Sequence, residues 1–227
     1  MVSQPTDLIY VKKIPENLLR DFFVKLAAIA KLLQVDPNWL MQVFQAESGV
    51  DPSRRNTYAP FHKKNGDLDG YATGFIQFVP DTARRMGTTT QALEKMGWIK
   101  QLDYVYKYLQ PYTGKIKNYF DLYLLVFFPA AVGHSNDDNW VFETKNISRL
   151  KIARANPAID INKNGTITMG EFKQYVKNTV QKSLWSKVFD TAQDIKRDIQ
   201  EHPVASGEIG AGAIAALLLV GLLVARK

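Results

Sequence analysis

A glutamate near the end of one helical segment is the first residue whose type and surroundings could support catalysis. The residues before it that recur at the spacing of one helix face are apolar: Trp39, Leu40, Val43 and Phe44. Glu47 continues this stripe, so its carboxyl group is expected on the buried side of the helix. Burial and the negative end of the helix dipole both disfavour a carboxylate anion. Both effects therefore favour a protonated acid, which the general acid of glycosidic cleavage requires.

Two sequence segments, one that contains Glu47 and one that follows it, contain further motifs. The segment QVFQAESGVDPSRRN holds the pair Glu47-Ser48 followed by a glycine and a proline turn, and ATGFIQFVPDTAR holds Gly74, Gln77 and a proline-threonine-alanine run. In this order and spacing the two segments resemble the catalytic segments of lytic transglycosylases and goose-type lysozymes. The resemblance covers residues 20–135 and implies a mainly α, lysozyme-like (α+β) domain.

The resemblance also implies roles for individual residues. Glu47 matches the catalytic acid, Ser48 the neighbour that holds its carboxyl group, and Gly74 and Gln77 match residues that line a saccharide groove. We add Tyr71, an aromatic residue of the intervening loop that could stack on a sugar ring, whereas Tyr104 and Tyr108 are interpreted as packing residues. The expected substrate is peptidoglycan, cleaved between N-acetylmuramic acid and N-acetylglucosamine without a catalytic cofactor.

The third segment of the family departs from its pattern. LLVFFPAAVG stands where the family has A-Y-N-A-G, so Phe128 replaces a tyrosine that would bond to the catalytic acid and Pro129 replaces an asparagine. Tyr119 or Tyr123 could supply the missing phenol. This departure leaves open an inactive saccharide-binding or structural membrane protein as an alternative function.

The product of cleavage is a second open alternative. The family implied here often works with one carboxyl group and forms a 1,6-anhydro sugar, whereas a hydrolysing lysozyme needs a held water, usually through a second carboxylate. Asp51, Asp67 and Asp69 could hold such a water, although turn formation explains their contexts as well. Lytic transglycosylase activity is therefore the favoured prediction.

A second motif, DINKNGTITMGE at residues 160–171, matches an EF-hand calcium loop. The predicted ligands are Asp160, Asn162, Asn164, the backbone carbonyl of Thr166, and Glu171. Two of these side chains are neutral asparagines, which predicts modest affinity. One loop without a second favours a structural role for Ca²⁺ over a calcium switch.

The periodicity of apolar residues predicts the following order of parts. An irregular N-terminal arm at 1–15 precedes a catalytic domain at 16–150, with helices from Pro15, after Asp36-Pro37, after Pro80, and over 99–109 and 119–128, and a short hairpin within 61–75. The calcium-loop region spans 156–178, an amphipathic helix 179–202, and an uncharged apolar run, Ile209–Ala225, suits a transmembrane helix.

Charge and composition bear on partners and location. The chain has 227 residues, a net charge of +7 and no cysteine, which excludes disulfides and thiolate metal sites. Its basic residues are scattered and match no nucleic-acid module, so we expect no nucleic-acid partner. An apolar C-terminal segment without a secretory signal suits a protein of a phage virion membrane or the host inner membrane, with viral capsid or spike proteins as possible partners.

Overall fold

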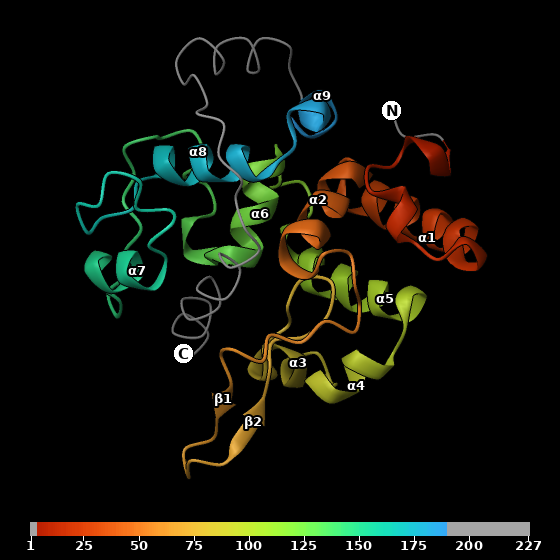
Figure 1. The fold of residues 1–227 in the computed structure, drawn as a ribbon, viewed down its shortest axis with the longest axis horizontal. Coiled ribbons are helices and arrows are strands. Elements are labelled where there is room, and N and C mark those ends of the chain that lie inside the picture. Colours follow the sequence, from red (N-terminus) through yellow and green to blue (C-terminus); the bar gives the residue numbers. More distant parts are fainter. Residues whose placement is uncertain (1–3, 190–227) are drawn as a thin grey trace. The chain divides into compact units, whose positions relative to one another are not determined.

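The computed structural model describes residues 4–189, and these residues form two compact units divided between Lys117 and Asn118 (Figure 1). Helices dominate both units, which confirms the mainly α class. The two units are described separately below.

The first unit begins with three 3₁₀ turns, Pro5–Asp7, Val11–Lys13 and Glu16–Leu18. The sequence predicts an irregular arm here, but Leu8, Ile9 and Ile14 are buried. The Ile9 backbone N–H donates to Asn38 Oδ1 at 2.9 Å, so this segment is tied to the following helices. It is irregular in form and packed in place.

Three longer helices carry the core of the first unit: α1 (Leu19–Leu33), α2 (Pro37–Ser48) and α5 (Trp98–Leu109). α1 packs on both α2 and α5. The apolar face of α1 is buried through Phe22, Leu26 and Leu33, as its periodicity predicts.

The rest of the first unit joins α2 to α5. The predicted hairpin is present as β1 (Phe61–His62) and β2 (Leu68–Gly70), paired antiparallel, and it extends away from the helices in Figure 1. Two short helices follow, α3 (Pro80–Arg85) and α4 (Thr90–Lys95), and the 3₁₀ turn Gln110–Tyr112 ends α5. The sequence prediction did not include α4. This helix begins at a cap in which Thr89 Oγ1 accepts a hydrogen bond from the Ala92 N–H at 3.1 Å.

The second unit is built on α6 (Tyr119–Phe127), α7 (Arg149–Ala155) and α8 (Met169–Thr179), with a 3₁₀ turn at Pro129–Ala131. Its core is aromatic. Phe142 lies 5.3 Å from Phe128 and 5.5 Å from Phe172 between ring centres, and Phe127 stacks on Phe172 at 5.4 Å. Such pairs add about 0.5–1.5 kcal/mol each beyond the burial of their area.

The chain after α8 differs from the sequence prediction of one amphipathic helix over 179–202. Val180 and Gln181 are extended, so α8 ends at Thr179, and a 3₁₀ turn (Lys182–Leu184) leads into a single turn, α9 (Trp185–Val188). Trp185 Nε1 donates to Val180 O at 3.0 Å, which stabilises this break. The remainder of the predicted helix lies outside the described residues.

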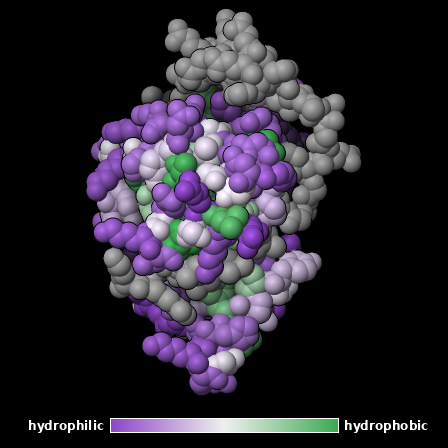
Figure 2. Space-filling model, turned by 90° about the vertical axis from the view of Figure 1, so that its left-hand side faces the viewer, coloured by the Kyte–Doolittle hydropathy of each residue, from purple (hydrophilic) through white to green (hydrophobic). Residues whose placement is uncertain are grey.

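Within residues 4–189 no helix is long and apolar enough to cross a membrane. The predicted transmembrane segment, Ile209–Ala225, lies outside the described residues. Figure 2 shows one face of the molecule, on which most described residues are hydrophilic and apolar residues form only small separate spots.

Candidate functional site

The C-terminal end of α2 holds the candidate acid. The helix starts as predicted, with Asp36 Oδ1 accepting from the Asn38 N–H at 2.7 Å, and it ends at Gly49, whose φ of +70° suits a glycine. Trp39, Val43 and Phe44 are buried, and Glu47 is only 4% exposed. The apolar stripe therefore includes the carboxyl group, as the sequence predicts.

Ser48, the next residue, connects α2 to a turn much later in the chain. Its Oγ lies 2.9 Å from Phe44 O and 3.3 Å from Phe75 O, and it accepts from the Asp51 N–H at 3.2 Å. The Phe75 ring also stacks on Phe44 at 4.7 Å. These contacts hold the end of α2, and with it Glu47, against the turn at residues 73–78.

That turn contains the two residues predicted to line a groove. It is closed by two hydrogen bonds between Thr73 and Phe78, of 3.1 and 2.8 Å, and Gly74 within it has a φ of +88°. Gln77 has a positive φ too, and its Nε2 donates to Arg54 O at 3.1 Å and to Gly74 O at 2.9 Å. Gln77 is 3% exposed, so in this structure its side chain braces the turn.

Gln101 on α5 is a site residue that sequence reasoning missed. It is fully buried, its Oε1 accepts from the Phe75 N–H at 2.7 Å, and its Nε2 donates to Pro52 O at 2.7 Å and Leu93 O at 2.9 Å. One side chain thus joins the loop after α2, the 73–78 turn and α4. Its place on the apolar side of α5, between Trp98 and Val105, was the available signal.

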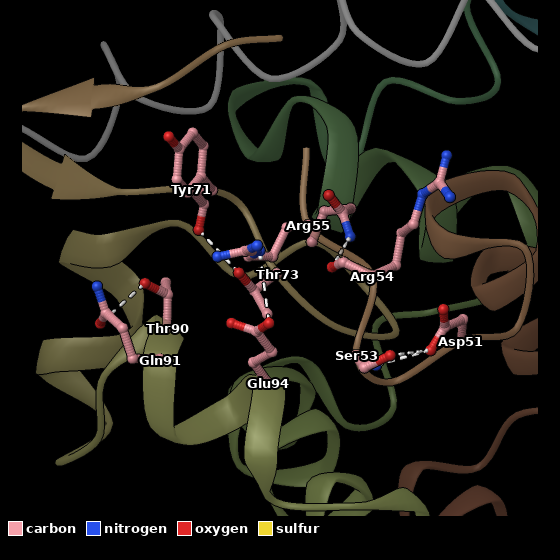
Figure 3. Close-up of polar contacts among 10 residues, drawn as sticks. Asp51, Ser53, Arg54, Arg55, Tyr71, Thr73, Thr90, Gln91 and Glu94 are labelled. Atoms are coloured by element: carbon pink, nitrogen blue, oxygen red, sulfur yellow. Dashed lines mark hydrogen bonds and ion pairs between the residues drawn. The ribbon is translucent and has the colours of Figure 1, made fainter. Parts of the chain in front are cut away.

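Tyr71 lies beside this turn and is half-buried. The Arg55 guanidinium carbon is 5.6 Å from the centre of the Tyr71 ring, and Arg55 Nε lies 3.4 Å from Glu94 Oε1 (Figure 3). Thr73 Oγ1 donates to Tyr71 O at 3.0 Å. A cation over an aromatic ring contributes about 0.5–1 kcal/mol at such sites. Tyr71 is therefore a positioned aromatic ring, with Arg54 extending in a different direction from Arg55.

The three aspartates considered for a catalytic water each have a local structural role. Asp51 Oδ1 accepts from the Ser53 N–H at 2.8 Å and from its hydroxyl at 2.7 Å (Figure 3). Asp67 Oδ2 accepts from Asn65 Nδ2 at 2.8 Å in the hairpin turn. Asp69 takes both arms of the Arg84 guanidinium, at 2.7 and 2.9 Å, and this pairing lowers the pKa of its carboxyl group.

The pKa of Tyr108 on α5 is affected by the charge of Glu47. Burial raises the pKa of its phenol above the ordinary value of 10.0, and the negative charges of Tyr112 and Glu47 raise it further, while Arg85 lowers it. Its ring lies edge-on to Phe78, at 6.2 Å between centres. The sequence suggested a packing role for Tyr108, and the structure adds that its phenol lies within electrostatic range of Glu47.

The segment that departs from the family pattern lies in the second unit. Phe128 is fully buried in the aromatic core, and Pro129 opens a 3₁₀ turn. Tyr119 and Tyr123 are buried in the same unit and stack on each other at 5.9 Å. Phe128 thus serves the core, which explains an aromatic ring without a hydroxyl at this position.

The calcium-loop motif forms a closed loop after α7, and its last three residues, from Met169 to Glu171, form the start of α8. The Asp160 carboxylate accepts from the Asn164 N–H at 3.1 Å and the Gly165 N–H at 3.0 Å. Glu171 Oε1 accepts from the Asn162 N–H at 3.3 Å across the loop, and Glu171 Oε2 accepts from the Thr168 N–H at 3.0 Å. Gly165 has a φ of +78°, as the sharp turn of such a loop requires.

The electrostatics of this loop suit a divalent cation. Asp160 is only 6% exposed, and within residues 4–189 neither Asp160 nor Glu171 has an ion-pair partner. Lys163, the nearest lysine in sequence, donates to Pro157 O instead. Buried charges in proteins are paired or bind metals. The predicted ligands, carboxylate, amide and backbone oxygens, are the hard donors that Ca²⁺ prefers.

Comparison of the chain with protein-family models, curated proteins and solved structures gives no significant match. The site geometry is therefore the basis for assigning function. That geometry consists of a buried carboxyl group at the end of α2, a braced turn at residues 73–78 that contacts the same helix end, and a positioned aromatic ring, Tyr71, next to this turn.

Proposed function

We propose that the chain cleaves the β-1,4 bond between N-acetylmuramic acid and N-acetylglucosamine in peptidoglycan, as a lytic transglycosylase with Glu47 as its acid. The observation that carries the proposal is the burial of Glu47, 4% exposed, on the apolar face of α2. Burial disfavours the charged form of a carboxyl group, so a protonated acid is favoured. The substrate class comes from the resemblance of the segment around Glu47 and the segment around Gln77 to lytic transglycosylases.

The proposed reaction uses one carboxyl group twice. Glu47 donates its proton to the bridging oxygen as the bond from that oxygen to C1 of muramic acid breaks, and the N-acetyl group of the substrate stabilises the positive charge at C1. The Glu47 carboxylate then removes the proton of the muramic acid C6 hydroxyl, whose oxygen bonds to C1. The product is a 1,6-anhydro sugar, and Glu47 regains its proton.

The surrounding residues support this reaction by position. Ser48 and the 73–78 turn fix the helix end that carries the acid, and Tyr71 offers a ring face for a sugar. Asp51, Asp67 and Asp69 have local partners, which favours a mechanism without a second carboxylate. Hydrolysis by a lysozyme mechanism is the alternative that these contacts disfavour.

Digestion of purified peptidoglycan by the full chain tests the proposal. Wild-type protein should release soluble muropeptides, and Glu47→Gln should lose at least about 100-fold in rate, the usual contribution of a general acid. Glu16→Gln, which makes the same change at an exposed glutamate outside the site, is the matched control. Retention of a tenth of wild-type activity by Glu47→Gln would exclude Glu47 as the acid.

A second candidate function is saccharide binding without cleavage. The observation that favours it is Phe128, which brings no hydroxyl to the place of the family's tyrosine. In that case the wild-type chain would sediment with insoluble peptidoglycan and release no muropeptides. The same digestion experiment therefore separates the two functions.

We also propose that residues 160–171 bind Ca²⁺ in a structural role. The support is the buried Asp160 carboxylate without an ion-pair partner in the described chain. Asp160, Asn162, Asn164, the Thr166 carbonyl and Glu171 would hold the ion. Calorimetric titration should detect binding at millimolar Ca²⁺, and Glu171→Ala should abolish it.

We further propose that Ile209–Ala225 anchors the protein in a phage virion membrane or the host inner membrane. The support is the sequence alone, an uncharged run of suitable length followed by Arg226-Lys227. Full-length protein should partition into detergent, whereas a chain without residues 207–227 should stay in the aqueous phase. Aqueous partitioning of the full chain would exclude the anchor.

A further inference from the structure

The calcium loop contains an extended segment whose backbone edge is already paired. Val141 and Thr168 form an antiparallel bridge. On either side of it, the Phe142 N–H donates to Ile167 O at 2.9 Å and the Met169 N–H donates to Trp140 O at 2.8 Å. Residues 138–142, called the partner strand below, therefore cover the edge of the loop.

Contacts beyond the bridge extend this pairing. The Gly170 N–H donates to Asp138 O at 2.9 Å, and Lys173 Nζ lies 2.6 Å from Asp138 Oδ1. Gly170 approaches closely: a Cβ atom at this position would lie 3.3 Å from Asp138 O. The end of the loop and the start of α8 are thus fitted to the partner strand.

The two segments also share one apolar core. Ile167 and Met169 from the loop side are fully buried, as is Phe142 from the partner strand. The Phe142 ring lies 5.5 Å from that of Phe172, which follows Glu171 directly in sequence. Displacing the partner strand would therefore expose apolar area as well as break hydrogen bonds.

An uncovered strand edge is a template for pairing with another chain. A calcium loop with a free edge would be completed by a second copy, whereas here the chain completes its own loop. The ion would bind Asp160 and Glu171, which lie at the two ends of the loop and flank the bridged residues. Any stabilisation from binding is then shared by the loop and the partner strand.

We propose that the partner strand is a built-in second half of the calcium site, so that one chain binds Ca²⁺ as a monomer and the ion stabilises residues 138–142 together with the loop. This inference rests on the proposed calcium binding. It assigns a function to a segment that neither the catalytic motifs nor the calcium motif includes.

Hydrogen–deuterium exchange of the full chain in detergent, with millimolar CaCl₂ or with EGTA, tests the coupling. Ca²⁺ should slow exchange of the Phe142, Met169 and Gly170 amides by at least about tenfold, because these amides donate across the interface. The Ile147 amide, which bonds to Thr144 in a separate turn, is the internal control and should change less than twofold. Glu171→Gln should remove the effect.

Gly170→Val tests the interface without changing a calcium ligand. The added side chain meets Asp138 and should weaken Ca²⁺ binding by about tenfold. Gln174→Val, on the same helix and outside the hydrogen bonds to the partner strand, is the matched control and should retain wild-type affinity.

The outcomes separate this inference from calcium binding itself. Calorimetry without a binding signal would overturn both proposals. Binding that leaves exchange in the partner strand unchanged, or that doubles the molar mass of the protein measured by light scattering, would overturn the built-in strand alone. A constant monomer mass with slowed exchange is the expected result.

Discussion

The Gln101 side-chain oxygen accepts a hydrogen bond of 2.7 Å from the backbone N–H of Phe75. In the sequence the two residues are separated by the short helices α3 and α4. Phe75 in turn stacks on Phe44 of α2, close to Glu47. The amide of Gln101 therefore connects α5 to the helix that carries the candidate acid.

Gln101→Leu should destabilise the protein by about 3 kcal/mol, because it leaves the Phe75 N–H and the Pro52 carbonyl buried without their partner. Urea denaturation followed by circular dichroism measures this change. Gln91→Leu is the matched control, since Gln91 is exposed, and should stay within about 0.5 kcal/mol. Equal effects of the two variants would contradict a bracing role for Gln101.

Gly74→Ala should be far more destabilising than Gly66→Ala, although both glycines have a φ of +88°. A Cβ at Gly74 would lie 2.5 Å from Gln101 Oε1, whereas nothing lies within 4 Å of one at Gly66. Gly66→Ala carries only the backbone strain, about 1–2 kcal/mol. Gly74→Ala adds displacement of Gln101 and should cost at least about 3 kcal/mol. Similar melting temperatures for the two variants would contradict this steric explanation.

The sequence predicted those parts of the site that depend on local pattern. The apolar stripe placed Glu47 on the buried face of α2, and Asp36-Pro37 and Gly49 marked the helix ends. Local pattern did not reveal Gln101, because its partners are backbone groups of distant loops that appear only in the folded chain.

Contacts that appear only in the folded chain also explain why the sequence prediction of one continuous helix after Thr179 was wrong. Apolar spacing after Thr179 suited one long helix, and Val180, Trp185 and Val188 are indeed buried. The extended backbone at Val180 and Gln181 interrupts the helix. The Val180 carbonyl accepts a hydrogen bond from the Trp185 indole N–H, which takes the place of a helical backbone hydrogen bond. Burial was predictable from periodicity, and the continuity of the helix was not.

The stability of the protein should fall in alkaline solution partly through Tyr108. Burial, together with the charges of Tyr112 and Glu47, raises the pKa of this phenol above 10.0 in the folded chain. The unfolded chain therefore loses this proton first as the pH rises, and the free energy of unfolding decreases. Tyr108→Phe should show a shallower decrease between about pH 9 and pH 12.

Urea denaturation at several pH values measures this slope. Tyr58→Phe is the control, because it removes a phenol from a residue that is 85% exposed. Parallel curves for wild type and Tyr108→Phe would show that the burial of Tyr108 does not contribute to alkaline unfolding.

The product of the proposed cleavage depends on whether a water molecule or the muramic acid C6 hydroxyl attacks C1. A hydrolysing enzyme usually holds its water with a second carboxylate. In the first unit Asp51 caps its own turn through Ser53, and Asp69 binds the guanidinium of Arg84 with both oxygens. Engaged carboxylates of this kind are poor bases for a water, so the hydroxyl of the substrate is the expected nucleophile.

Mass spectrometry of digested peptidoglycan should therefore show muropeptides that end in 1,6-anhydro-muramic acid. These are lighter than hydrolysed muropeptides by the mass of one water molecule, because no water is added. Asp67→Asn and Asp69→Asn should keep activity within about threefold of wild type, since neither side chain takes part in the reaction. Reducing ends that accept borohydride would instead indicate hydrolysis. One of these two aspartates should then prove as important as Glu47, because inverting hydrolysis needs a second carboxylate as the base that activates the attacking water.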